Sequence, residues 1–221
     1  MAQKPSAKMM ISSLLSFVVV TAIQVWAWGD LRSFFAHPAR LLMAAVFLGV
    51  SVATVFSGMN MSAGKRVDKR DALILIPITV LTAAATVSLP YMDRRDIWTF
   101  DGDAARYTGL LVITAGGVLR VWPFFVLGRR FSGLVAIQEN HTLVTDGIYR
   151  TIRNPSYLGV LVTMLGWAFI FRGVLGLALT ALYVPLLIIR IHDEERMLAS
   201  EFGEEYAASC KRTWRLVPFV Y

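Results

Sequence analysis

Arg190 and Glu194 are the residues of this chain best suited to chemistry, because they stand four positions apart directly after a long apolar segment. On a helix this spacing places both side chains on one face, one turn apart. A surface ion pair is one interpretation, and such a pair contributes little. The other is a guanidinium that binds a substrate carboxylate through two hydrogen bonds, beside a carboxylate that faces a cationic cofactor. The end of an apolar segment favours the second interpretation, since an amphiphile would place its headgroup at that depth. His192 and Asp193 lie on another side of the same turn and are expected to be solvated.

A second polar segment, residues 141–159 (HTLVTDGIYRTIRNPSYLG), lies between two apolar blocks and is too polar to cross a membrane. Asn154 precedes Pro155, and proline is tolerated in the first turn of a helix, so Asn154 is expected to cap a helix here. The unpaired amide groups of a helix N-terminus attract a carboxylate or a phosphate. A simple cap, with Tyr157 as an anchor at the membrane interface, is the structural alternative.

Arg120 interrupts another apolar segment about two turns from its end. An ionisable residue inside a membrane span is a functional candidate. A side chain that reaches back to the interface near Pro123 is the competing interpretation, so Arg120 is given no catalytic role.

The composition indicates an integral membrane protein. Hydrophobic residues make up 56% of the 221 positions and charged residues 17%, and the mean hydropathy is +0.58; these values lie outside the range of soluble domains. The net charge of +7 comes from basic residues that gather in particular loops, which favours membrane orientation over nucleic-acid binding. One cysteine and three scattered histidines exclude a disulfide framework and predict no metal site. The chain also lacks a glycine-rich nucleotide-binding loop, so a Rossmann domain is not expected.

The apolar segments predict an all-α fold, a polytopic transmembrane bundle of about six helices. About 20 apolar residues cross the hydrocarbon core of a bilayer. Four predicted spans cover residues 9–28, 39–57, 72–89 and 104–127. A longer apolar block breaks at Arg172-Gly173 and predicts a helical hairpin of residues 157–171 and 174–191. We therefore divide the chain into four helices (1–130) and a region with the polar loop, the hairpin and a C-terminal catalytic segment (131–221), within one integrated domain.

The orientation follows from the basic residues. They gather before the first span, between the second and third, after the fourth and after the sixth. The positive-inside rule therefore predicts that both termini and the polar motifs lie in the cytoplasm.

The order of motifs in residues 141–218 resembles the isoprenylcysteine carboxyl methyltransferase family. The motifs are HTLVTDGIY, RNPSYLG, an apolar hairpin, R-x-x-x-E, FGEEY and a terminal RLVPF. The resemblance implies a membrane enzyme that uses S-adenosylmethionine without a Rossmann fold. It implies a lipophilic, isoprenylcysteine-like substrate that enters from the bilayer and whose carboxylate is methylated. Such a reaction needs alignment and desolvation but no general base.

The resemblance also implies roles for individual residues. Arg190 would bind the substrate carboxylate, and Glu194 would contact the cofactor and offset its sulfonium charge. Asn154 stands where the family usually has a histidine. The implied cofactor-binding residues are Gln138, His141, Thr142, Leu143, Val144, Tyr149, Asn154, Pro155, Ser156, Tyr157 and Glu194.

Three other classes stay open on the sequence. A sterol-type membrane reductase that uses NADPH shares a late arginine–leucine–proline stretch and an acidic pair. A phospholipid N-methyltransferase would use the same cofactor as the carboxyl methyltransferases. A small transporter or lipid-binding scaffold would instead place its polar groups near mid-bilayer.

Overall fold

The chain folds almost entirely into helices. The computed structural model describes residues 7–57, 66–67, 69–127, 136–137 and 143–221. These residues form α1 (Ala7–Trp28), α2 (Leu31–Ala36), α3 (Pro38–Phe56), α4 (Lys69–Arg94), α5 (Asp103–Leu127), α6 (Pro155–Ile170) and α7 (Val174–Cys210). A 3-10 turn, η2 (Gly147–Arg150), precedes α6, and the two-residue strands β1 (Arg66–Val67) and β2 (Ala136–Ile137) pair antiparallel. The predicted all-α class is confirmed, although α2 raises the number of α-helices among the described residues to seven.

Five of these helices are long and apolar enough to cross a membrane: α1, α3, α4, α5 and α7. The predicted hairpin is also present, because α6 and α7 are joined only by residues 171–173. α6 has 16 residues and spans roughly 24 Å at 1.5 Å per residue. The predicted end of the last helix at Ile191 is wrong, since α7 continues to Cys210 over 37 residues. The apolar pattern stops at the membrane boundary, whereas backbone hydrogen bonding continues beyond it.

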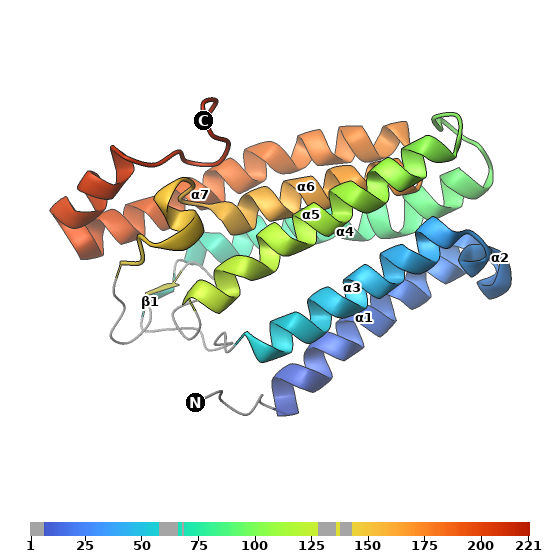
Figure 1. Ribbon diagram of the computed structural model, residues 1–221, viewed down its shortest axis with the longest axis horizontal. Helices are drawn as coiled ribbons and strands as arrows, with labels where there is room; N and C mark the ends of the chain where they lie inside the picture. The colour runs from blue at the N-terminus through green and yellow to red at the C-terminus, as the bar shows by residue number, and fades with distance from the viewer. Residues whose placement is uncertain (1–6, 58–65, 68, 128–135, 138–142) are drawn as a thin grey trace.

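The six longest helices form a ring. α1 packs against α3 and α4, α3 against α5, α5 against α6, α6 against α7, and α7 against α4. Figure 1 shows these helices side by side along the long axis of the molecule. The start of α1, η2 and the C-terminal segment lie at one end, whereas α2 and the α4–α5 connection lie at the other.

Glycines allow the closest helix contact in the bundle, between the antiparallel helices α5 and α6. A Cβ atom added at Gly116 would lie 2.5 Å from Thr163, and one at Gly159 would lie 2.5 Å from the backbone nitrogen of Arg120. Gly109 and Gly166 meet at the next contact along the same interface. Small residues let helix backbones approach closely in a membrane, where dispersion and not water exclusion drives helix packing.

The apolar core lies toward the α2 end of the bundle. Its buried members come from α1 to α6 and the turn after α6: Trp28, Phe34, Met43, Ala85, Leu89, Ile113, Trp167, Ile170 and Phe171. This cluster of buried apolar side chains therefore lies away from the end that carries the polar motifs.

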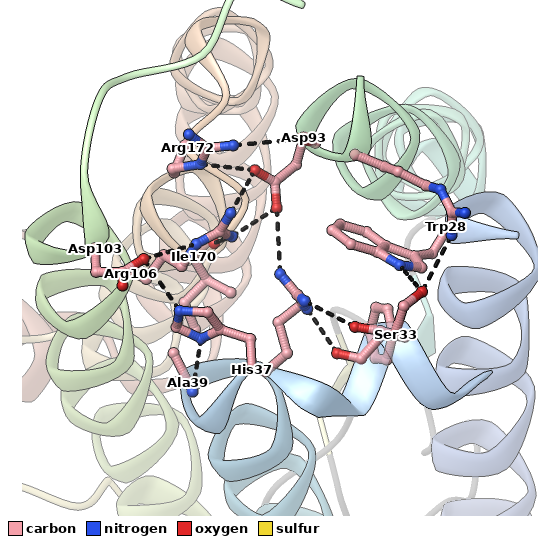
Figure 2. A network of polar contacts seen from close by, with 12 residues as sticks. Trp28, Ser33, His37, Ala39, Asp93, Asp103, Arg106, Ile170 and Arg172 are labelled. Atoms are coloured by element: carbon pink, nitrogen blue, oxygen red, sulfur yellow. Dashed lines mark hydrogen bonds and ion pairs between the residues drawn. The ribbon is translucent and has the colours of Figure 1, made fainter. Parts of the chain in front are cut away.

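A buried carboxylate at the α2 end joins four parts of the fold. Asp93 of α4 has a fully buried side chain and accepts hydrogen bonds from Arg106 of α5 (2.6 and 2.9 Å) and from Arg172 of the α6–α7 turn (2.8 Å). Arg40 of α3 lies 3.7 Å away, and its guanidinium stacks on the ring of Trp28 at 4.0 Å. Figure 2 shows the side chains converging on this single carboxylate. Asp93 thus offsets the positive charge of three guanidinium groups at once.

Candidate functional site

The first turn of α6 and the middle of α7 meet at the opposite end of the bundle and bring the predicted residues together. The side chain of Tyr157 donates a hydrogen bond from Oη to Oε2 of Glu194 at 2.8 Å. The guanidinium carbon of Arg190 lies 5.6 Å from the centre of the Tyr157 ring. Arg190 is only 9% exposed, so its charge lies where water screens it weakly. An arginine, a carboxylate and a phenol therefore share one site at the end of membrane-length helices.

Arg120 adds a second guanidinium to this site, which the sequence left undecided. Its Nη1 donates a hydrogen bond to Oγ of Ser156 at 2.5 Å, and its guanidinium lies 5.4 Å from the Phe124 ring. The side chain thus bridges α5 to the first turn of α6, within electrostatic range of Arg190 and Glu194. An arginine inside a span was the signal that could have identified this position.

Asn154 stands at the predicted N-cap position, and Pro155 follows it as the first residue of α6. The predicted capping role of the Asn154 side chain is wrong, because it makes no hydrogen bond to the first turn. Instead its Nδ2 donates to the backbone oxygen of Arg215 (2.9 Å) and to Oε1 of Glu195 (3.4 Å). The amide therefore connects the start of α6 to the C-terminal segment.

The polar loop before α6 contributes apolar and phenolic surface. Leu143 and Val144 are half-buried in an irregular stretch that leads into η2. Burial raises the pKa of Tyr149, and the nearby charge of Glu194 raises that pKa further. The phenol of Tyr149 therefore stays protonated and can donate a hydrogen bond.

Three of the predicted cofactor-binding residues lie outside the described residues. These are Gln138, His141 and Thr142.

Other polar residues of α7 differ in part from the sequence-based expectation. His192 is exposed, as predicted. Asp193 is 2% exposed and pairs with Arg196, so the prediction that it is solvated is wrong. Sequence reasoning also missed Glu195, which binds Arg153 and Arg215. Both arginines come from distant parts of the chain, and neighbour rules along one helix cannot identify such partners.

The ring of helices, five of them long and apolar enough to cross a membrane, defines the class as an integral, multi-pass membrane protein with an arginine–carboxylate–phenol site at one end. The model of the isoprenylcysteine carboxyl methyltransferase (ICMT) family matches residues 108–200, the stretch that contains Arg120, Tyr157, Arg190 and Glu194. Over this stretch the chain is similar to the enzymes of this family. The family uses S-adenosylmethionine as methyl donor.

Similar proteins extend the match over most of the chain. The chain is 28% identical to protein-S-isoprenylcysteine O-methyltransferase B of Arabidopsis thaliana, over 84% of this chain and 89% of the relative. It is 33% identical to the human protein-S-isoprenylcysteine O-methyltransferase, over 51% of this chain and 41% of the relative. The solved structure of a eukaryotic intramembrane Ras methyltransferase ICMT has the same fold, with a TM-score of 0.52, 20% identity and 99% coverage of both chains.

Proposed function

We propose that this protein transfers a methyl group from S-adenosylmethionine to the carboxylate of a lipophilic, isoprenylcysteine-like substrate, such as the C-terminus of a prenylated protein. The observation that carries this proposal is the cluster of Arg190, Tyr157 and Glu194 at one end of membrane-length helices. The names of the relatives support the same acceptor.

Arg190 is the proposed ligand of the substrate carboxylate. A guanidinium binds a carboxylate through two parallel hydrogen bonds. The low exposure of Arg190 strengthens that attraction, because water screens the two charges less. Arg120 adds positive charge from α5 and, through Ser156, holds the first turn of α6 in place. A substrate with a free carboxylate is therefore favoured over one that ends in an amine or an amide.

Glu194 is the proposed counter-charge for the methyl donor. Its carboxylate would face the sulfonium, and the hydrogen bond from Tyr157 fixes its orientation. The half-buried side chains of Leu143, Val144 and Tyr149 offer surface for the nucleoside. We propose Gln138, His141, Thr142, Asn154, Pro155 and Ser156 as further parts of the cofactor pocket. This set of one carboxylate, hydrogen-bond donors and apolar groups fits a cationic nucleoside.

The proposed reaction requires alignment more than acid–base chemistry. A carboxylate oxygen forms a bond to the methyl carbon while the carbon–sulfur bond breaks, and the electron pair stays on the sulfur. No proton moves, so no general base is needed. The chain's own residues would hold the carboxylate, orient it and keep water away from it.

We further propose that α6 is a sixth membrane crossing and that both termini and the site lie in the cytoplasm. An even number of crossings is supported by the position of the α1 start and the C-terminal segment at one end of the bundle (Figure 1). In this arrangement residues 1–130 form a membrane scaffold that also supplies Arg120, and residues 131–221 carry the rest of the site, as parts of one domain. The lipid tail would reach the site from the bilayer and the cofactor from the aqueous side.

Methyl transfer with a radiolabelled donor tests the proposal. The acceptor is an S-prenylated cysteine with a blocked amine, and its matched control is the same compound with the carboxylate converted to an amide. We expect base-labile methyl ester on the acid alone. Transfer to phosphatidylethanolamine instead would favour the phospholipid N-methyltransferase class, and binding of NADPH without binding of S-adenosylhomocysteine would favour the reductase class.

Two substitutions separate the proposed roles. Arg190→Gln is expected to raise KM for the acceptor at least tenfold while the dissociation constant of S-adenosylhomocysteine stays within about twofold, since one charged hydrogen-bond pair contributes roughly 1.5–3 kcal/mol. Glu194→Gln is expected to weaken binding of S-adenosylmethionine, which carries a sulfonium, more than binding of S-adenosylhomocysteine, whose sulfur is uncharged. Equal effects on donor and acceptor in both variants would contradict the assignment.

A further inference from the structure

Glu194 and Glu195 are neighbours on α7, but their side chains serve different parts of the molecule. One residue step turns a helical side chain by about 100°. Glu194 accepts the hydrogen bond of Tyr157 within the site. Glu195, 8% exposed, accepts a hydrogen bond on each carboxylate oxygen from a different arginine: Arg153 Nε reaches Oε1 at 3.1 Å and Arg215 Nε reaches Oε2 at 2.8 Å. Glu195 is thus the shared partner of two segments that do not belong to α7.

Arg153 extends this connection to the residues that follow α7. Its Nη1 donates to the backbone oxygen of Cys210 and to Oγ1 of Thr213, both at 3.1 Å, and also to the Thr213 backbone oxygen. The backbones join as well: the Arg153 amide donates to the Trp214 oxygen at 2.9 Å, and the Trp214 amide donates to the Thr151 oxygen at 2.8 Å. The loop before α6 and the segment after α7 are therefore fastened to each other and to Glu195. We call Glu195, Arg153, Asn154 and Arg215 the carboxylate clasp.

Polar contacts fasten the C-terminal segment at this place, beside the buried side chain of Leu216. An open cavity of about 610 Å³ lies between α7 and the chain after it, and its lining includes Glu195, Tyr206, Cys210 and Arg215. α7 bends at Gly203, whose φ of +48° is not helical. Side chains that border a cavity lack dispersion partners on that side, so close packing there cannot replace the contacts of Glu195 and Arg215.

We propose that Glu195 is a positioning residue that keeps the cofactor pocket closed by fastening the loop before α6 and the C-terminal segment onto α7. The proposal rests on the proposed function, because the fastened loop carries Leu143, Val144 and Tyr149. A loop that is ordered before binding loses less conformational freedom when the ligand binds. Glu195 therefore acts on cofactor affinity through Arg153 and Arg215, without contact with the reacting atoms.

Glu195→Gln tests this role, with Glu205→Gln as the matched control on the exposed part of the same helix. We expect Glu195→Gln to raise the dissociation constant of S-adenosylhomocysteine and KM for the donor at least tenfold, with kcat at saturating donor within about twofold. Glu205→Gln is expected to leave all three unchanged. Unchanged affinity in Glu195→Gln, or a loss of kcat at unchanged affinity, would overturn the proposal.

A second measurement tests the clasp without the cofactor. Lys211 and Arg212 are exposed trypsin sites between the two residues that Arg153 holds, and trypsin cuts exposed segments when they open. We expect cleavage at this site, followed by mass spectrometry, to be at least fivefold faster in Glu195→Gln than in the unmodified protein and in Glu205→Gln. Equal rates would refute the clasp.

These measurements separate failure of the clasp from failure of the proposed function. If the unmodified protein binds no adenosyl ligand, the proposed function fails, while the cleavage rates still judge whether Glu195 holds the two segments. If Glu195→Gln is recovered unfolded, Arg215→Lys takes its place under the same criteria. Lysine keeps the charge but loses the planar guanidinium that bonds both Glu195 and Tyr221.

Discussion

Replacement of Asp93 by asparagine is expected to destabilise the bundle far from the site. The Asp93 side chain is fully buried and receives two hydrogen bonds from Arg106 and one from Arg172, with Arg40 at 3.7 Å. Asparagine keeps one acceptor oxygen but presents an NH₂ donor to a guanidinium where the second oxygen accepted. It also removes the negative charge that lies within 4 Å of all three arginines, whose side chains are 6%, 7% and 15% exposed.

Two estimates of the size of this effect agree. A hydrogen bond between charged groups contributes about 1.5–3 kcal/mol, so the loss of two costs roughly 3–6 kcal/mol. Removal of one partner from a buried ion pair costs roughly 3–5 kcal/mol. For a chain of this length each kcal/mol lowers Tm by about 2–4 °C, so Asp93→Asn is expected to lower Tm by at least about 6 °C.

Thermal unfolding in detergent, followed by tryptophan fluorescence, measures this loss. Asp96→Asn is the control, because Asp96 also binds Arg172 but its side chain is 72% exposed, and an exposed pair contributes about 0–1 kcal/mol. If uncompensated charge is the cause, Arg40→Met should recover part of the stability in the Asp93→Asn background but not in the unmodified protein. A Tm within about 2 °C of the unmodified protein for Asp93→Asn would refute the reasoning.

Three further predictions concern the helix interface and the site. Gly116→Val is expected to prevent close packing of α5 on α6, because the Cβ of the valine alone would lie 2.5 Å from Thr163. Both the yield of folded protein and the activity in detergent extracts should fall, and a normal yield would contradict this prediction. Tyr157→Phe removes the hydrogen bond to Glu194 and is expected to lower kcat/KM roughly 3- to 30-fold at unchanged Tm, measured with the radiolabelled donor. The pKa of Tyr149 is raised in the folded protein, so the phenol loses its proton at a lower pH in the unfolded chain, and the stability that Tyr149 contributes falls as the pH rises above about 10. The Tm of Tyr149→Phe should therefore fall less between pH 9 and pH 11 than the Tm of the unmodified protein. Equal decreases in Tm would exclude the effect.

The helices could be predicted from the sequence because the requirement for about 20 apolar residues per crossing is strict. The hairpin break at Arg172-Gly173 was found for the same reason, since 35 apolar residues cannot form one span. The end of α7 could not be found from hydropathy, because the helix continues into polar sequence up to Cys210.

The parts of the site whose residues are close in the sequence could be predicted, whereas the contacts between residues that are distant in the sequence could not. Arg190 and Glu194 share a helix face by simple periodicity, and Asn154-Pro155 identified the start of α6. The partners of Glu195 are about 20 and 40 positions away, and the partner of Arg120 is 36 positions away. Such pairs depend on how helices pack, and one sequence does not contain that information in any local pattern.

The length of α7 also determines the depth in the membrane at which the site lies. Up to the bend at Gly203, residues 174–202 of α7 extend roughly 43 Å, beyond the approximately 30 Å of bilayer hydrocarbon. Arg190 stands roughly 24 Å along the helix from Val174, so the number of residues between them sets the distance from the α6–α7 turn to Arg190. The height at which a lipid-borne carboxylate meets its methyl donor is therefore fixed by covalent geometry. A membrane of different thickness would have to tilt the helix or deform around it.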